Sequence, residues 1–150
     1  MTVLAPRRLT RPVQVGSVRI GGGAPVLNQA MATADTRDPQ ATLRQINELA
    51  EAGCEIVRIA VPDRKAAAAL PDIVPWSPVP LIADIHFEHT LALKALDAGI
   101  HGLRLNPGNI RKHAAVVEVA QRGKGLRVPA KHKARNAGST PYREILVEYK

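Results

Sequence analysis

Six polar residues lie inside or just after short apolar runs of this 150-residue chain: Arg58, Asp84, His86, Arg104, Asn106 and Asn109. An arginine side chain keeps its charge and offers a fork of donors that matches two phosphate oxygens. Asparagine side chains add neutral donors, and an aspartate with a nearby histidine could move protons or orient a ligand. We therefore predict a site for a phosphorylated small molecule, with Asp84 and His86 as its catalytic pair.

Four strand–helix units are expected to position these residues. The apolar runs predict strands near 25–31, 55–61, 79–85 and 102–106. The helical spacing of apolar residues predicts helices near 39–52, 64–70, 88–98 and 110–122. A β-hairpin at 13–21, turning at Gly16-Ser17, is expected to precede them.

The helix ends carry their own signals. Asp38 followed by Pro39 is typical of a helix start, and Gly53 is typical of a helix end. Asp63 is expected to cap a short alanine-rich helix. We expect that helix to stop before Pro71, because proline removes a helical hydrogen bond.

Consecutive strand–helix units favour parallel strands joined by right-handed crossovers. Two α/β architectures fit: a doubly wound open sheet, or a partial (β/α)8 TIM-type barrel of about four to five units, since a full barrel needs about 250 residues. No GxGxxG motif follows the first strand, which argues against the dinucleotide-binding open sheet. In both architectures the carboxyl ends of the strands meet on one face, so the polar residues would share one site.

Simpler roles for these residues stay open. Arg58 or Arg104 could form a structural ion pair with Asp84. A metal site made of Asp84 and His86 is disfavoured, because two ligands two residues apart are common by chance, and no metal is predicted. Three further histidines are expected on helix or loop surfaces without a role: His89, His101 and His113.

The net charge of +8 is unevenly distributed. Residues 1–120 hold 13 Lys/Arg and 11 Asp/Glu, whereas residues 121–150 hold 8 and 2. An alternative function is therefore an open α/β module that binds nucleic acid or another polyanion through a basic tail. Nucleic acid is disfavoured because no aromatic residue near 122–135 could stack on bases.

Two further features are typical of a cytoplasmic enzyme. No apolar run reaches the roughly 18 residues of a membrane span, and no apolar stretch follows the basic N-terminus as in a secretory signal. The only cysteine, Cys54, cannot form an internal disulfide. An iron–sulfur cluster held by this chain's own cysteines is excluded, because such a cluster needs several thiolates.

Several stretches of the sequence resemble motifs of a known family. "VRIAVP" (57–62), "ADIHF" (83–87) and "LRLNPGNI" (103–110) are similar, in order and spacing, to the 4-hydroxy-3-methylbut-2-enyl diphosphate synthase family of the non-mevalonate isoprenoid pathway. "VGSVRIGGGAPV" (15–26) and "TRDPQATLRQINELAEAGCEIVR" (36–58) resemble its N-terminal region. The resemblance covers roughly residues 7–125.

The resemblance implies a barrel followed by a smaller domain that carries a [4Fe-4S] cluster. Such an enzyme reductively opens 2-C-methyl-D-erythritol 2,4-cyclodiphosphate with two electrons from ferredoxin or flavodoxin, and works as a homodimer. Arg58 and Arg104 would grip diphosphate oxygens, and Asp84 and His86 would line the pocket. Four further residues would also bind substrate: Asn106, Asn109, Asn136 and Ser139.

The chain departs from the family pattern in three places. Ala30 stands where the family has a serine. The fifth-strand region diverges, so that Arg127 or Arg135 would replace the family's arginine. The chain also ends before any cluster ligand, so we expect a truncated protein that is inactive alone. The expected parts are an N-terminal arm (1–12), half a barrel with its hairpin (13–125), and a divergent basic tail with room for a C-terminal helix (126–150).

Overall fold

The computed structural model describes residues 10–106, 109–110, 113–122 and 145–148. The predicted hairpin is present as β1 (Val13–Val15) and β2 (Val18–Ile20), which pair antiparallel. Gly16 turns it with φ +55°, and a Cβ there would lie 2.9 Å from Pro80 Cγ. Glycine is therefore needed for both its backbone conformation and its lack of a side chain.

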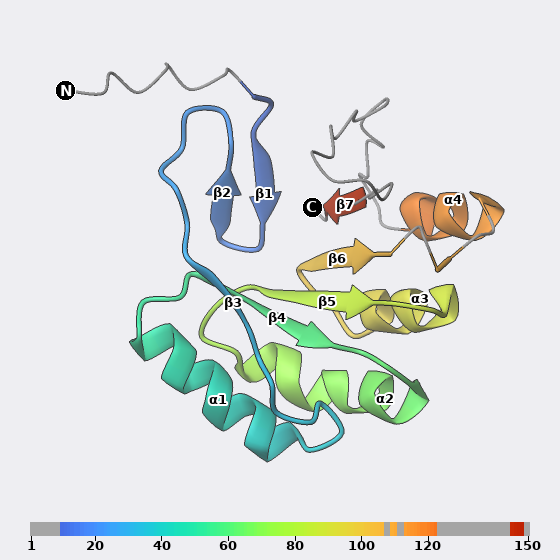
Figure 1. Ribbon diagram of the computed structural model, residues 1–150, viewed down its shortest axis with the longest axis horizontal. Coiled ribbons are helices and arrows are strands. Elements are labelled where there is room, and N and C mark those ends of the chain that lie inside the picture. The colour runs from blue at the N-terminus through green and yellow to red at the C-terminus, as the bar shows by residue number, and fades with distance from the viewer. Residues whose placement is uncertain (1–9, 107–108, 111–112, 123–144, 149–150) are drawn as a thin grey trace, which may run out of the picture.

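The remaining strands of the described part form one five-stranded sheet in the order β3-β4-β5-β6-β7. They are β3 (Gln29–Met31), β4 (Ile56–Ala60), β5 (Leu81–Ile85), β6 (Gly102–Leu105) and β7 (Ile145–Glu148). β3 to β6 are parallel neighbours in chain order, whereas β7 runs antiparallel beside β6 (Figure 1). A doubly wound sheet would reverse its strand order at a switch point, so the sequential order of the described strands favours the barrel prediction.

The helices of the described part lie on one face of this sheet, as in the outer ring of a barrel (Figure 1). They are α1 (Pro39–Glu51), α2 (Arg64–Ile73), the short 3₁₀ helix η1 (Val74–Trp76), α3 (His89–Asp97) and α4 (His113–Arg122). α1 contacts α2, α2 contacts α3, and α3 contacts α4. Each helix therefore lies on the same face of the sheet, after the strand that precedes it in the chain.

The predicted helix starts are confirmed, but one predicted helix end is wrong. Asp38 accepts a hydrogen bond from the Ala41 N–H, and Asp63 accepts from Lys65 and Ala66. α2 continues through Pro71 to Ile73. Leu70 and Ile73 are fully buried on either side of the proline, and their packing outweighs the lost hydrogen bond.

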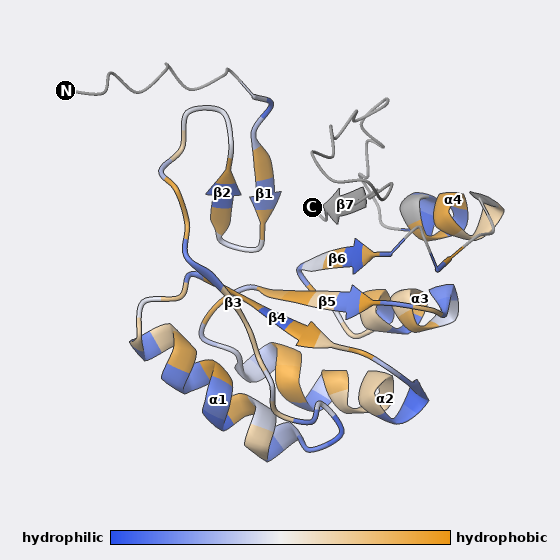
Figure 2. Ribbon diagram, in the orientation of Figure 1, coloured by the Kyte–Doolittle hydropathy of each residue, from blue (hydrophilic) through white to orange (hydrophobic). Residues whose placement is uncertain are grey.

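The sheet buries apolar residues on both faces, but with different partners. Seven strand residues pack with the helices in the main core: Val57, Ile59, Leu81, Ala83, Ile85, Leu103 and Leu105. On the other face, Ile56 and Ile82 pack with Val15 of the hairpin. The orange segments of β4 and β5 in Figure 2 follow this burial, and a blue segment near the end of each of β5 and β6 marks a polar residue. The hairpin thus covers the amino ends of the strands.

His101 has a role that the sequence analysis missed. Its Nδ1 accepts a hydrogen bond from the Leu81 N–H at 3.1 Å, where β5 begins. Burial lowers the pKa of His101, in keeping with a neutral imidazole that can accept. The ring therefore anchors the start of β5.

Part of the C-terminal prediction needs correction. Ile145–Glu148 is the strand β7, not a helix, and it pairs with the edge of β6. Because an open strand edge carries unpaired backbone groups, this pairing supplies partners for that edge. The rest of the predicted tail, with the fifth-strand candidates Arg127 and Arg135, lies outside the described residues.

Candidate functional site

Strand alternation places three charged residues on the face of the sheet that the helices leave uncovered. Arg58 follows Val57, Asp84 follows Ala83, and Arg104 follows Leu103, and each of those apolar neighbours packs against the helices. Successive side chains of a strand point to opposite faces. The register pairs Asp84 with Arg104, and Met31 with Arg58. We call Arg58, Asp84 and Arg104 the interior triad.

Asp84 is the centre of the interior triad. Its side chain is 1% exposed, and Nη1 of Arg104 donates to Oδ1 at 2.9 Å and to Oδ2 at 3.0 Å. A buried carboxylate needs such a charged partner, because desolvation of an unpaired charge costs several kcal/mol. The ion pair between Arg104 and Asp84 considered in the sequence analysis is therefore present.

Arg58 approaches the same carboxylate from the other side. Its Nε lies 3.6 Å from Asp84 Oδ2, within ion-pair range but too far for a hydrogen bond. Nε is buried and has no hydrogen-bond acceptor among the described residues. Nη2 donates to the sulfur of Met31 at 3.4 Å, a weak acceptor. One carboxylate thus faces two arginines, and one buried donor has no acceptor within the part of the chain that the structure describes.

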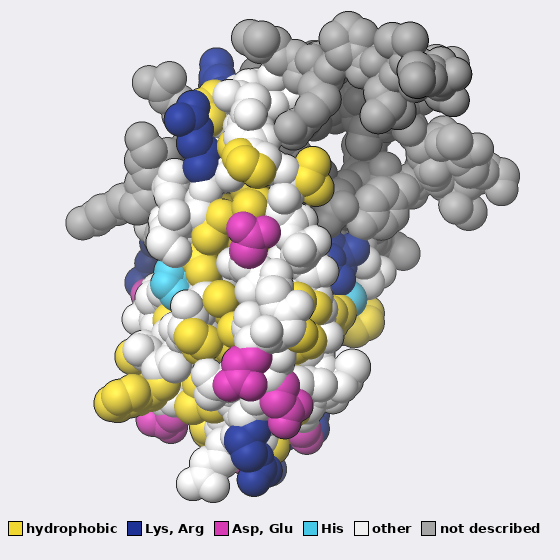
Figure 3. Space-filling view, turned by 90° about the vertical axis from the view of Figure 1, so that its left-hand side faces the viewer, with side chains coloured by type: hydrophobic (Ala, Val, Ile, Leu, Met, Phe, Trp, Pro, Cys, Tyr) yellow, Lys and Arg dark blue, Asp and Glu magenta, His cyan; other side chains and the backbone are white. Residues whose placement is uncertain are grey.

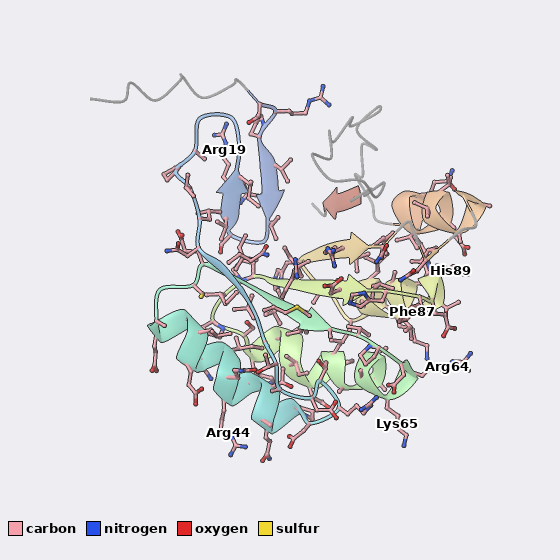
Figure 4. The ribbon with its side chains drawn as sticks, viewed as in Figure 1. Arg19, Arg44, Arg64, Lys65, Phe87 and His89 are labelled. Carbon is pink, nitrogen blue, oxygen red and sulfur yellow. The ribbon has the colours of Figure 1, made fainter. Side chains whose placement is uncertain are left out.

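His86 stands just beyond the triad. Its Nε2 lies 3.7 Å from Asp84 Oδ1, and its ring centroid lies 6.0 Å from that of Phe87. Figure 4 shows Phe87 and His89 at the end of the molecule toward which β5 and β6 point, whereas Arg19 lies on the hairpin away from it. The predicted pair of Asp84 and His86 is therefore brought together at the carboxyl ends.

The asparagines follow β6 in a turn. The carbonyl of Asn106 accepts from the N–H groups of Asn109 and Ile110, and the Asn106 N–H donates to the Ile85 carbonyl at 3.1 Å. The turn therefore continues the strand end beside β5. The other two predicted residues of the site, Asn136 and Ser139, lie outside the described residues.

Comparison with known proteins shows to which family the chain belongs. The family described as "GcpE TIM-barrel domain" matches residues 10–149, nearly the whole chain. The chain belongs to this family. The family's name agrees with the sequential parallel strands and with the barrel predicted from the sequence.

Three curated relatives of this GcpE chain carry the name 4-hydroxy-3-methylbut-2-en-1-yl diphosphate synthase (flavodoxin). The relative from Magnetococcus marinus is 52% identical over 149 residues, which cover 99% of this chain and 40% of the relative. That from Geobacter sulfurreducens is 54% identical over 140 residues, 93% of this chain and 39% of the relative. That from Lawsonia intracellularis is 56% identical over 118 residues, 79% and 33%. The chain therefore spans two fifths or less of the length of these relatives.

The residues of this GcpE chain do not fit the family's [4Fe-4S] cluster. The whole sequence contains one cysteine, Cys54, and clusters of this type are held by several cysteine thiolates. Within the described ranges no group of three or more His, Cys, Asp or Glu side chains could hold a metal ion. Within the same ranges no helix is long and apolar enough to cross a membrane.

A second charged cluster at the carboxyl ends was not predicted from the sequence. Nη2 of Arg37 lies 2.7 Å from Asp63 Oδ2, and Nη1 lies 3.0 Å from Asp35 Oδ2. The hydrogen bond from the Arg37 side chain is the main cause that lowers the pKa of Asp63 to about 2, and the backbone N–H of Arg37 is the main cause that lowers the pKa of Asp35. We call these three residues the rim clasp, because they join the loop after β3 to the start of α2.

The side of the described part on which the sheet strands begin has a mixed surface (Figure 3). Figure 3 looks onto the side where the sheet strands begin. Hydrophobic groups there alternate with acidic groups and with separate Lys or Arg groups, so this side of the described part presents no continuous basic surface. The basic tail of the alternative function lies almost wholly outside the described residues.

Proposed function

We propose that this chain is the substrate-binding half of a 4-hydroxy-3-methylbut-2-en-1-yl diphosphate synthase barrel. Its ligand is 2-C-methyl-D-erythritol 2,4-cyclodiphosphate, held through Arg58 and Arg104. The observation that carries the proposal is the interior triad: a buried carboxylate lies between two arginines, and the buried Nε of Arg58 has no acceptor among the described residues. The names of the relatives add the diphosphate chemistry.

The charges of the triad explain why an anion is the fitting ligand. Two guanidinium groups and one carboxylate leave a net charge of +1 in a site where the Asp84 side chain is 1% exposed. A phosphate oxygen would supply the acceptor that Nε of Arg58 lacks, and would neutralise the remaining charge. Asp84 keeps both arginines aimed at one place, so ligand binding does not require their ordering.

His86 and the Asn106 turn would complete the ligand contacts. His86 sits 3.7 Å from Asp84 at the strand ends, where it could hold or deliver a proton to the sugar phosphate. Asn109, in the turn that follows Asn106, is exposed, and its side chain offers a neutral donor. Asn136 and Ser139 remain predicted contacts from the tail.

Reduction would need parts that this chain does not supply. The cluster's role is to deliver electrons, and its ligands would come from residues outside this chain. We propose flavodoxin as the electron donor of the whole protein, as the relatives' names indicate for them, and a homodimer as its assembly. This chain by itself is expected to bind the cyclodiphosphate without reducing it.

Calorimetric titration of the cyclodiphosphate tests the proposal. A bidentate Arg–phosphate contact is worth about 1.5–3 kcal/mol, so Arg104→Ala should weaken binding on the order of 10- to 100-fold. Arg104→Lys should restore only part of the affinity, because lysine lacks the fork. Arg44→Ala is the matched control, since Arg44 lies on α1, which belongs to the helix face of the sheet (Figure 4).

Two results would contradict the proposal. Equal affinity of wild type, Arg104→Lys and Arg104→Ala would remove Arg104 from the site. Absence of binding by the wild-type chain, with its melting transition intact, would mean that these strands do not form a diphosphate site.

A further inference from the structure

Met31 has an unusual position for a methionine. It lies at the end of β3, a strand that pairs only with β4 among the described residues, and it is 40% exposed. Its sulfur accepts from Nη2 of Arg58 at 3.4 Å. The thioether is therefore both reachable from solvent and in contact with a residue of the interior triad.

We propose that Met31 is an oxidation site that controls the anion site through Arg58. The proposal rests on the proposed function, because it concerns the same arginine. A peroxide is the oxidant. The Met31 sulfur forms a bond to one peroxide oxygen, the O–O bond breaks, and two electrons pass from sulfur to the peroxide. The second oxygen leaves with both protons as water, and Met31 becomes a sulfoxide.

Oxidation changes the acceptor that faces Arg58. A thioether sulfur is a weak acceptor, whereas a sulfoxide oxygen is strongly polar. Because the sulfur lies 3.4 Å from Nη2, an oxygen added to it beside the line between the two atoms can lie within hydrogen-bond distance of the guanidinium. Nη2 of Arg58 would then donate to the sulfoxide and turn toward β3. A phosphate would then have to compete for this donor with a stronger acceptor than the thioether sulfur of the reduced protein.

The rest of the chain makes the effect easy to isolate. The sequence has two methionines, and Met1 lies outside the described residues. Cys54 is partly exposed and can also react with peroxide. Met31→Leu keeps Cys54 while removing the sulfur beside Arg58, so any effect of Cys54 would persist in that variant. Met31→Gln places a permanent carbonyl acceptor near Arg58 and should imitate the oxidised state.

The experiment compares the full wild-type chain with both variants before and after hydrogen peroxide. Mass spectrometry of peptides reports oxidation of Met31, and calorimetry reports the Kd for the cyclodiphosphate. In the wild type, oxidation should raise Kd on the order of tenfold, the loss of one charge-assisted hydrogen bond. Treatment with methionine sulfoxide reductases should reduce Met31 again and restore the original Kd. The Kd of Met31→Leu should be the same before and after peroxide, and Met31→Gln should bind as weakly as the oxidised wild type.

Several results would overturn the proposal. Met31 could be oxidised with no change in Kd, or Met31→Leu could lose as much affinity as the wild type, which would assign the effect to Cys54. Failure of the untreated wild type to bind would instead contradict the proposed function. In that case the NMR signal of the Arg58 Nε–H decides alone: a shift on oxidation, absent in Met31→Leu, supports the switch, and an unchanged signal overturns it.

Discussion

The interior triad and the rim clasp use the same residue types in opposite proportions. The interior triad places one aspartate between two arginines, and its side chains are 24%, 1% and 14% exposed in the order Arg58, Asp84, Arg104. The rim clasp places one arginine between two aspartates, and all three side chains are more than 40% exposed. Both clusters stand at the carboxyl ends of strands.

The difference shows that burial and the ratio of arginines to aspartates distinguish a cluster that binds a ligand from one that holds loops in place. A net positive charge in a protected place attracts an anion and is little screened by salt. A net negative charge on an open surface repels phosphate, and solvent weakens its ion pairs. The interior triad therefore suits ligand binding, whereas the rim clasp suits holding two loops together. Four experiments can distinguish the two clusters.

The largest expected effect is the loss of stability when Asp84 is neutralised. Asp84→Asn would remove the buried carboxylate that both partly buried arginines of the interior triad approach. Breaking a buried ion pair on one side costs about 3–5 kcal/mol. Urea unfolding followed by circular dichroism measures the change in the free energy of unfolding. Asp97→Asn is the control, since Asp97 pairs with Arg122 on an exposed surface at 3.8 Å. Similar losses in both variants would show that the triad is not protected from solvent.

The setting of the interior triad could largely be predicted from the sequence, because the strand and helix signals around it are local. Apolar runs around Arg58, Asp84 and Arg104 were enough to predict three strands, and the meeting of parallel strand ends was enough to predict one shared site. Asp38 before Pro39 was enough to predict where α1 starts. In each case the signal lies within a few residues of the element.

The features that were not predicted depend on contacts between residues far apart in the sequence. Arg37 and Asp63 are 26 positions apart, and nothing in either segment indicates the other. β3 begins at Gln29, later than predicted, because the Asn28 N–H bonds to the Glu55 side chain instead of a neighbouring strand. β7 was not predicted as a strand. Its partner, β6, is about 40 residues earlier in the chain, and long-range pairing leaves little local signal in the sequence.

The second test separates the two clusters by ligand affinity. Arg58→Ala should raise the Kd for the cyclodiphosphate on the order of 10- to 100-fold, because it removes a charge-assisted contact. Arg37→Ala should leave Kd nearly unchanged, since the Arg37 guanidinium already pairs with two carboxylates. Calorimetric titration of both variants measures the ratio. A comparable loss in Arg37→Ala would place the rim clasp in the binding site.

The third test uses acid. The pKa of Asp63 is lowered to about 2 in the folded chain, chiefly by its hydrogen bond from Arg37, so the folded state binds fewer protons than the unfolded state between about pH 4 and 2. Its contribution to stability is therefore complete above about pH 4 and is lost as the pH falls toward 2. Melting temperatures of wild type and Arg37→Leu should converge over this range. A constant difference down to pH 2 would mean that Arg37 acts by packing.

Salt should give the smallest and most discriminating effect. The Debye length falls from about 10 Å at 0.1 M salt to about 3 Å at 1 M, so ion pairs in contact with solvent weaken and protected pairs do not. Destabilisation by Arg37→Leu, seen as a lower melting temperature, should therefore shrink between 0.1 M and 1 M sodium chloride. Destabilisation by Asp84→Asn should persist, because its main cause is desolvated charge and not long-range attraction. If salt reduced both effects in the same proportion, the two clusters would share one dielectric environment. Burial would then not reserve the interior triad for a ligand, even with the geometry of both clusters unchanged.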